Sequence, residues 1–242
     1  MAEYKLKWDE SGQKIYETGT KNGVVYPWVD GATTETSGYL HGYAWNGLTG
    51  YTESPDGADE TALYADDIKY LSMRSVENFG FTIKAYTYPD EFEQCDGTAN
   101  IEGIPGVKAG QQKRRMFGFS VITTVGNDSE GNDYAEKLHI IYGVTCAPSE
   151  KDYQTINDSP EAIEFSWDCT TTPIDMPGNL KKSAQITIDT SKFKNASGDL
   201  TESKLIENYG KLKEALYGTG STDAHLPMPT EVVSIMKTGA AG

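Results

Sequence analysis

The stretch 117–146, FGFSVITTVGNDSEGNDYAEKLHIIYGVTC, decides the fold of this chain. Within 117–125 the apolar residues Phe117, Phe119 and Val121 recur at a period of two, which is typical of a strand with one buried face. Within 138–146 the same period predicts one face made of Leu138, Ile140, Tyr142, Val144 and Cys146. The polar residues 126–133 lie between these runs and predict a long hairpin tip. An antiparallel strand pair is therefore expected at the centre of the fold.

The same alternation recurs on both sides of this pair. Clear strands are predicted at 79–87, 162–169 and 184–189, and weaker ones at 14–19, 24–28, 41–51 and 63–72. The 162–169 strand follows a turn at 157–160, and Pro173 marks its end.

One apolar stripe of helical spacing follows the strands. Leu205, Tyr209, Leu212 and Leu216 predict a helix at about 201–217. Asp199 or Thr201 can cap its start and Gly218 ends it. A second, short helix is possible around 89–95, after Pro89.

Consecutive strands joined by hairpins favour antiparallel pairing over parallel units with crossover helices. We therefore expect a mainly β fold: an antiparallel β-sandwich or barrel of two packed sheets with one flanking α-helix. The 242 residues predict a single domain over 1–242, with its core at about 14–192 and a flexible tail at 238–242.

The charge of the chain excludes some partners. There are 36 acidic and 21 basic residues, a net charge of −15, and residues 51–100 alone carry −8 from 11 acidic and 3 basic residues. Such a chain is poorly suited to grip DNA by counterion release or to adhere to an anionic membrane. No apolar run is long enough to span a bilayer, and the start MAEYKLKWDE has no apolar core of a secretory signal.

No pattern for catalysis or for a cofactor emerges. Phosphate-binding loops and the HExxH motif are absent, and Cys95, Cys146 and Cys169 lack the spacing of a metal site, so buried reduced thiols are expected. The acidic groups 66–67 and 90–93 would serve a glycosidase only if two carboxylates faced each other across a cleft. The loop 128–133 resembles a calcium loop only loosely, because Asp133 stands where glycine is required. We therefore expect no enzymatic activity and no cofactor.

Two segments are candidates for contacts with other molecules. The polar stretch 50–62, GYTESPDGADETA, is long for a connection without structure of its own, so it is either a disordered surface loop or has a role outside the domain. Its candidate residues are Tyr51, Thr52, Glu53, Ser54, Pro55, Asp56, Gly57, Ala58, Asp59, Glu60 and Thr61. The basic run Lys113, Arg114 and Arg115 is either a solvated surface or a contact to an acidic surface of a neighbouring subunit.

The order of many short motifs resembles the major tail proteins of long-tailed phages, of the phi13 type. The motifs are WNGLT (45–49), ESPDGA (53–58), ALYADDIKYL (62–71), FG (79–80), AYTYPDEF (85–92), CDG (95–97), GQQ (110–112), FG (117–118), GND (126–128), IIYG (140–143), APSEK (147–151), NDSPEA (157–162) and FSW (165–167). They extend over about residues 40–192.

This resemblance implies a tail tube protein. Members of the family form hexameric rings that stack into a hollow tube through which phage DNA passes. The loop at 50–62 would correspond to the one that reaches a neighbouring subunit or ring. Implied partners are the protein itself and the tape-measure, terminator and distal tail proteins. DNA would be a cargo that an acidic lumen does not grip. The implied location is the virion tail, after synthesis in the bacterial host cytoplasm.

Two other functions remain open from the sequence. A carbohydrate-binding β-sandwich would use exposed aromatic rings, for which Trp8, Trp28, Trp45 and the many tyrosines are the candidates. An acidic glycosidase would use Glu91 and Glu93.

Overall fold

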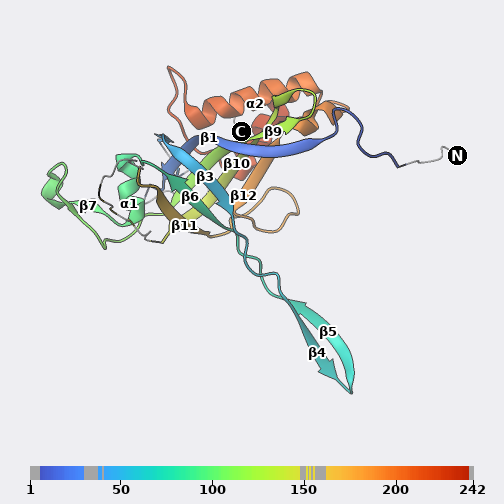
Figure 1. Cartoon of the computed structure of the whole chain (residues 1–242), viewed down its shortest axis with the longest axis horizontal. Coiled ribbons are helices and arrows are strands. Elements are labelled where there is room, and N and C mark those ends of the chain that lie inside the picture. The colour runs from blue at the N-terminus through green and yellow to red at the C-terminus, as the bar shows by residue number, and fades with distance from the viewer. Residues whose placement is uncertain are drawn as a thin grey trace.

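One antiparallel sheet of eight strands forms the body of the protein (Figure 1). The computed structural model describes residues 6–29, 38–39, 41–147, 151, 153, 155 and 162–239. The strands are β1 (Ile15–Pro27), β2 (Tyr43–Trp45), β3 (Leu48–Glu53), β6 (Gly80–Ala85), β9 (Phe117–Asn127), β10 (Gly131–Cys146), β11 (Phe165–Thr171) and β12 (Gln185–Asp189). Their order is β2-β1-β9-β10-β11-β6-β3, with β12 also pairing to β10. The predicted mainly β, antiparallel fold class is confirmed, but the described part of the body contains one sheet and not the two packed sheets that were expected.

Two small hairpins project from the body. The first is formed by β4 (Glu60–Ala65) and β5 (Ile68–Arg74), and the second by β7 (Ala99–Asn100) and β8 (Lys108–Ala109). The helical elements are η1 (Asp90–Phe92), α1 (Glu93–Asp96), η2 (Ile101–Gly103), η3 (Thr190–Asn195), α2 (Glu202–Tyr217) and α3 (Pro229–Thr238).

The central strands are buried on both faces, because each face supports a separate core. The inner core lies within the curved sheet and contains Phe119 of β9, Ile83 of β6 and Trp167 of β11. The outer core lies between the sheet and the helices and contains Ile122 and Ile140 from the sheet. The helices contribute Tyr209, Leu212, Leu216, Val232 and Ile235. Burial on both faces explains why 117–125 contains few polar side chains.

A bulge at Gly143 changes the face of β10, and one sequence prediction is wrong there. Leu138, Ile140 and Tyr142 belong to the outer core as expected, but Val144 and Cys146 belong to the inner core. Gly143 has φ +61°, and the pairing register with β9 shifts between Ile141 and Val144. The single face predicted from Leu138 to Cys146 therefore splits in two, because a bulge interrupts the period of two.

This bulge allows β10 to pair with two different strands along its length. Its first part, Lys137–Ile141, pairs with β12, and its last part, Val144–Cys146, pairs with β11. The Gly143 N–H donates to the Tyr39 hydroxyl over 2.9 Å, and its carbonyl accepts from Thr172 N over 2.9 Å. A side chain at this position would meet the Thr172 carbonyl oxygen at 2.4 Å, so only glycine fits.

The two ends of the sheet approach each other, so the body resembles a partly closed barrel. β2 pairs with β1 at one end, and β3, which follows after Asn46 and Gly47, pairs with β6 at the other. The side chain of Leu48 lies directly over Gly23, where an added Cβ would meet it at 2.1 Å. This close approach brings the sheet around the inner core.

The helix expected at about 201–217 is α2, and Thr201 caps it by accepting from Lys204 N over 3.4 Å. Gly218 follows its last residue, as predicted. The short helix expected around 89–95 is formed by η1 and α1. The prediction of a single flanking helix is incomplete, since α3 also covers the outer core with Val232 and Ile235. The predicted flexible tail begins inside α3 at Thr238, and its residues 240–242 lie outside the described part of the chain.

The hairpin between β9 and β10 is shorter at its tip than predicted. Only residues 128–130 lie between the two strands, and residues 126–127 and 131–133 belong to the strands themselves. The Asn127 side chain accepts hydrogen bonds from Ser129 N and Glu130 N and closes the tip. Asparagine and aspartate favour such local bonds, which explains the polar composition without a loop of eight residues. The turn predicted at 157–160 lies outside the described residues.

Replacing Gly143 by alanine is expected to lower the free energy of unfolding by about 2–4 kcal/mol, because the new Cβ meets backbone in a strained conformation. Urea unfolding followed by tryptophan fluorescence measures this effect. Gly131→Ala is the matched control, since Gly131 has φ +64° but no atom within 4 Å of an added Cβ. It should lose only about 1–2 kcal/mol, and equal losses in both variants would contradict the role assigned to the Thr172 contact.

Candidate assembly arm and the surfaces around it

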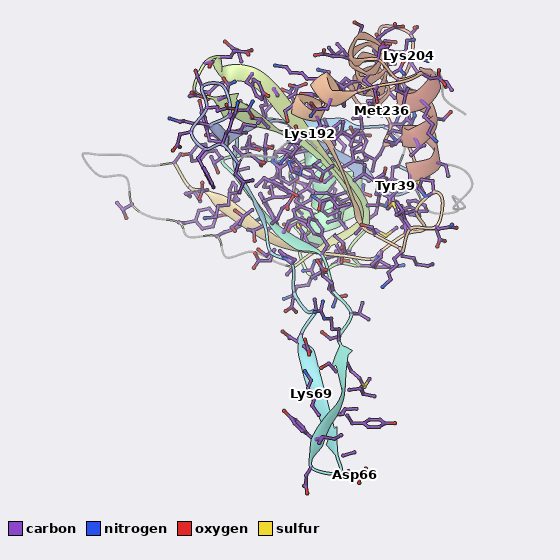
Figure 2. The ribbon with its side chains drawn as sticks, turned by 90° about the vertical axis from the view of Figure 1, so that its right-hand side faces the viewer. Tyr39, Asp66, Lys69, Lys192, Lys204 and Met236 are labelled. Carbon is purple, nitrogen blue, oxygen red and sulfur yellow. The ribbon has the colours of Figure 1, made fainter. Side chains whose placement is uncertain are left out.

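The β4–β5 hairpin forms an arm that extends away from the body (Figures 1 and 2). We define the arm as residues 54–79, between the end of β3 and the start of β6. Asp66 lies at its tip in Figure 2, far from the sheet and the helices. Two-stranded hairpins alone are only marginally stable in water, so an arm of this kind is suited to gain its stability from a partner.

The register of the arm separates an apolar face from a polar face. Cross-strand partners share a face, and neighbours along a strand point to opposite faces. Leu63 pairs with Leu71, Thr61 with Met73 and Ala65 with Ile68. A register shift between Leu63 and Tyr64 skips Tyr70, so that Ile68 lies on the same apolar face as Leu71. The larger side chains of this face are exposed: Ile68 by 64%, Met73 by 57%, Leu63 by 42% and Leu71 by 40%.

The charged side chains on the polar face of the arm form ion pairs with one another. Glu60 pairs with Lys69 over 2.9 Å and approaches Arg74 at 3.9 Å. A hydrogen bond from Ser72 and one from Lys69 lower the pKa of Glu60. The charged residues Glu60, Lys69 and Arg74 of this face therefore have partners in the free subunit, whereas Tyr64 on the same face is exposed by 73%.

Backbone geometry defines both ends of the arm. At the tip, Asp66 and Asp67 have φ +52° and +61°, the left-handed pair of a tight hairpin turn. At the neck, Asp56 N donates to the Asn78 carbonyl oxygen over 2.9 Å, and Asn78 N donates to the Asp56 carbonyl oxygen over 2.7 Å. Gly57 follows with φ +95°, and an added Cβ would meet the Val76 carbonyl oxygen at 2.3 Å. The chain thus leaves the body through a narrow neck that requires glycine.

The prediction that 50–62 lacks structure of its own is wrong. Tyr51, Thr52 and Glu53 belong to β3, Glu60 and Thr61 belong to β4, and Ser54–Asp59 form one side of the neck. Similarly, the strand predicted at 63–72 is really the two strands of the hairpin. The hairpin was difficult to recognise from the sequence because neither of its faces is buried in the subunit. Its residues therefore show only a weak alternation of apolar and polar side chains. Its role in assembly stays a prediction.

A polar cluster joins the base of the arm to the body. The carboxylate of Glu53, at the end of β3, lies 3.1 Å from His139 Nδ1 and accepts hydrogen bonds from Tyr51 and Gln185 at 2.9 and 2.6 Å. On its other side, His139 Nε2 lies 3.0 Å from Thr123 Oγ1. Sequence reasoning missed this cluster, because its members lie far apart along the chain and belong to no short motif.

A carboxylate, an imidazole and a hydroxyl in this order also occur in hydrolases, where backbone N–H groups hold the oxyanion. Here the hydroxyl belongs to Thr123 in the middle of β9, which pairs on one side with β1 and on the other with β10. Its neighbouring N–H groups are therefore directed along the sheet towards these strands. We interpret the cluster as an anchor for the arm.

The basic run 113–115 lies at the base of the second projection. We define the β7–β8 protrusion as residues 97–115. Its base is held by backbone bonds from Gln112 to Gly97 and from Arg115 to Gln94. Lys113 and Arg114 are exposed and Arg115 is half-buried, and none of the three forms an ion pair within the described part of the chain. The tip exposes Ile101 by 45%, Ile104 by 49% and Val107 by 46%.

The acidic groups considered for catalysis do not face one another across a cleft. Glu93 is buried and pairs with Lys108, whereas Asp90 and Glu91 are exposed. Asp66 and Asp67 lie at the tip of the arm.

The loop compared with a calcium site has a structural role. Asp128 accepts hydrogen bonds from Gly12 N and Lys14 N, so it joins the N-terminal segment to the β9–β10 hairpin. Among the described residues, no group of three or more histidine, cysteine, aspartate or glutamate side chains is arranged to hold a metal ion.

The three cysteines are buried and free, as the sequence predicted. Burial raises the pKa of Cys95 and of Cys146 to about 12, which keeps both thiols protonated and unreactive at neutral pH. Within the described ranges, no helix has both the length and the apolar character needed to cross a membrane.

Of the three tryptophans proposed for sugar binding, two are packed against other rings, whereas tyrosines such as Tyr64 and Tyr86 are exposed. Trp45 is buried, donates to the Thr87 carbonyl oxygen over 2.8 Å and contacts Phe92 and Trp167. Trp28 packs edge-on against Tyr39 with ring centroids 4.8 Å apart. Only Trp8 of the three tryptophans is exposed, at 75%.

The chain matches no protein-family model and no curated protein. Among solved structures it is similar to a chain of the anti-feeding prophage baseplate, with 5% identity and a TM-score of 0.33 over 69% of this chain and 92% of that chain. It is also similar to a chain of the sheath-tube complex of PVC, an extracellular contractile injection system, with 12% identity and a TM-score of 0.29 over 69% and 88%. Because both TM-scores lie below 0.5, neither match determines a fold or a role. The resemblance to phi13-type tail proteins stays a prediction.

Two histidines should make the stability of the protein depend on pH in opposite directions. Burial lowers the pKa of His139, and this effect exceeds the attraction of Glu53 for the charged form. Below about pH 6.5, the pKa of an unperturbed histidine, the unfolded chain therefore binds the proton before the folded one does. Stability is then lost as the pH falls. His139→Gln should reduce this loss in urea unfolding between pH 7.5 and 5.

His225 provides the matched comparison. Its hydrogen bond to Glu231, at 3.3 Å, raises the pKa of the imidazole, so its stabilising contribution is complete below the unfolded pKa and disappears as the pH rises. His225→Gln should therefore make the loss of stability towards pH 5 steeper than in the wild type. If both variants changed the pH dependence in the same direction, the assignment for one of the histidines would be wrong.

Proposed function

We propose that this protein is a structural, non-enzymatic subunit of a phage tail-like assembly. In this proposal it forms hexameric rings that stack into a tail tube, the conduit for DNA ejection. Its partners are other copies of itself and the tape-measure, terminator and distal tail proteins. Its location is the virion tail. The two matched chains come from assemblies of a related kind, but at their TM-scores the proposal depends on the arm and on the sequence resemblance.

The observation that supports self-assembly best is the arm. It exposes the large apolar side chains of Leu63, Ile68, Leu71 and Met73 on one face, while the charged residues of the opposite face are paired with one another. An exposed apolar hairpin is an aggregation hazard that a soluble monomer would avoid. An arm that is covered by another subunit explains both its apolar face and its distance from the body.

The charge of the chain agrees with DNA as a passing cargo. A net charge of −15 repels phosphates, so that DNA would slide through a lumen of such subunits without being held. This argument supports a conduit and opposes a DNA-binding protein.

The alternative functions have less support. A carbohydrate-binding module would need a platform of exposed rings, but Trp45 is buried and Trp28 is packed against Tyr39. An acidic glycosidase would need Glu93 free, but this carboxylate is paired with Lys108.

The purified protein should form rings or tubes about 100 Å wide in negative-stain electron microscopy, since sheet layers of roughly 10 Å surround a lumen. Replacing residues 57–77 by Asn-Gly should abolish these assemblies, because Asp56 and Asn78 can then be joined by a two-residue turn without the arm. Circular dichroism and thermal unfolding test whether the body stays folded. Tubes of normal width from the shortened, folded chain would exclude the arm as the assembly element.

A finer test separates the two faces of the arm. Leu63→Ser together with Leu71→Ser removes apolar contact area, and should raise the concentration needed for assembly by about tenfold or more. Tyr64→Ser is the control, because Tyr64 is 73% exposed and points to the opposite face from Leu63. Light scattering against protein concentration measures the difference. Equal effects of the two changes would mean that the apolar face has no special role.

A further inference from the structure

We infer that the surface that receives the arm is the β7–β8 protrusion of a second copy of this chain. This inference rests on the proposed function, and it names the two surfaces that meet. It depends on the charge and the apolar character of two projections that are separate in the structure.

The arm combines an apolar face with an excess of negative charge. Residues 54–79 contain six acidic and two basic residues, a net charge of −4. The two basic residues, Lys69 and Arg74, both lie beside Glu60. The other five acids, Asp56, Asp59, Asp66, Asp67 and Glu77, form no ion pair within the described ranges. A partner for the arm must therefore supply both apolar surface and positive charge.

The β7–β8 protrusion offers both of these properties. Residues 97–115 contain four basic residues and one acidic residue, a net charge of +3 in a chain of −15. Lys108 is already paired with Glu93, so the charge available to a partner is that of Lys113, Arg114 and Arg115. The apolar tip is compact, because Ile101 N bonds to the Val107 carbonyl and Ile104 N to the Ile101 carbonyl, at 2.8 and 2.9 Å.

The arm and the protrusion are complementary in charge, and both expose apolar side chains. Ile101, Ile104 and Val107 match the aliphatic face of the arm, and the basic base of the protrusion matches its unpaired acids. Opposite charges at the rim of an interface guide encounter and fix register more than they add affinity, so the apolar contact would supply most of the binding free energy.

The receiving protrusion belongs to another molecule. Figure 1 shows the arm and β7 leaving the body on different sides, so an arm held in its observed direction does not meet its own protrusion. Contact between unlike surfaces of identical subunits is head-to-tail, the type that closes into rings or extends into filaments. The pairing therefore agrees with a repeating assembly.

Photo-crosslinking tests the pairing directly. A photoreactive phenylalanine analogue is placed at position 71 on the apolar face, and in a matched control at position 64 on the polar face. Mixing copies labelled with ¹⁴N and ¹⁵N identifies crosslinks between molecules by mass spectrometry. The expected result is a crosslink from position 71 to residues 97–115 of another copy, at least about tenfold more abundant than from position 64. Assembly should also weaken at high salt.

A charge exchange provides the second measurement. Lys113→Glu with Arg114→Glu should reduce assembly by about tenfold or more, and Asp59→Lys with Glu77→Lys should do the same. The chain that carries all four changes should recover assembly, because the opposite charges face each other again. Crosslinks from position 71 to a different part of another copy, or no recovery in the fourfold variant, would overturn the pairing and leave self-assembly intact. A monomer without intermolecular crosslinks at any concentration would overturn both.

Discussion

The structure depends on the change of face at Gly143 in β10, a strand that contributes to both hydrophobic cores. β10 places Ile140 against the helices and Val144 inside the curved sheet, and it pairs with β12 and β11 in turn. A regular strand could not do this, because its alternation would keep both side chains on one face. The bulge at Gly143 moves the alternation by one residue, and its left-handed backbone fits directly against Thr172. The bulge therefore brings Val144 and Cys146 into the inner core at the point where β10 pairs with β11.

The tips of both projections lie outside the two cores, so they are available for contacts with other molecules. Both cores are filled mainly by residues of the sheet and the helices, and of the arm only Phe79, at its end, packs against the inner core. The arm and the protrusion carry opposite charge in a molecule that is strongly negative as a whole. In the proposed pairing, two copies repel each other at long range and attract each other where these projections meet. Such a balance favours one relative orientation over random association.

Much of the fold could be predicted from the sequence, because strands with a buried face impose a visible pattern. The alternation at 79–87, 117–125 and 184–189 and the stripe from Leu205 to Leu216 correspond to β6, β9, β12 and α2. The pattern failed where burial does not control composition. The arm has no buried face, and its Asp66-Asp67 turn lacks the glycine that usually reveals a hairpin. The change of face at Gly143 was hidden because the apolar residues keep a period of two in the sequence from Leu138 to Cys146, straight through the bulge.

The candidate site also has parts that the sequence predicts and parts that it does not. The basic run 113–115 and the polar stretch around Asp56 are recognisable as unusual segments, since charge and composition are properties of neighbouring residues. The anchor at the base of the arm is different, because Glu53 and His139 come from β3 and β10 and meet only when the sheet curves around its inner core. No spacing within the chain predicts such a contact. α3 was missed because its first residue, Pro229, resembles a turn signal as much as a helix start.

The narrow neck of the arm has a consequence for how this protein can vary. Beyond the bridge between Asp56 and Asn78, no residue of the arm packs into a core of the body. Insertions, deletions or new side chains beyond that bridge therefore leave the packing of the body unchanged. The part that determines how copies recognise each other can diversify while the part that determines the fold is kept. A single scaffold of this kind is able to yield assemblies that do not mix with one another.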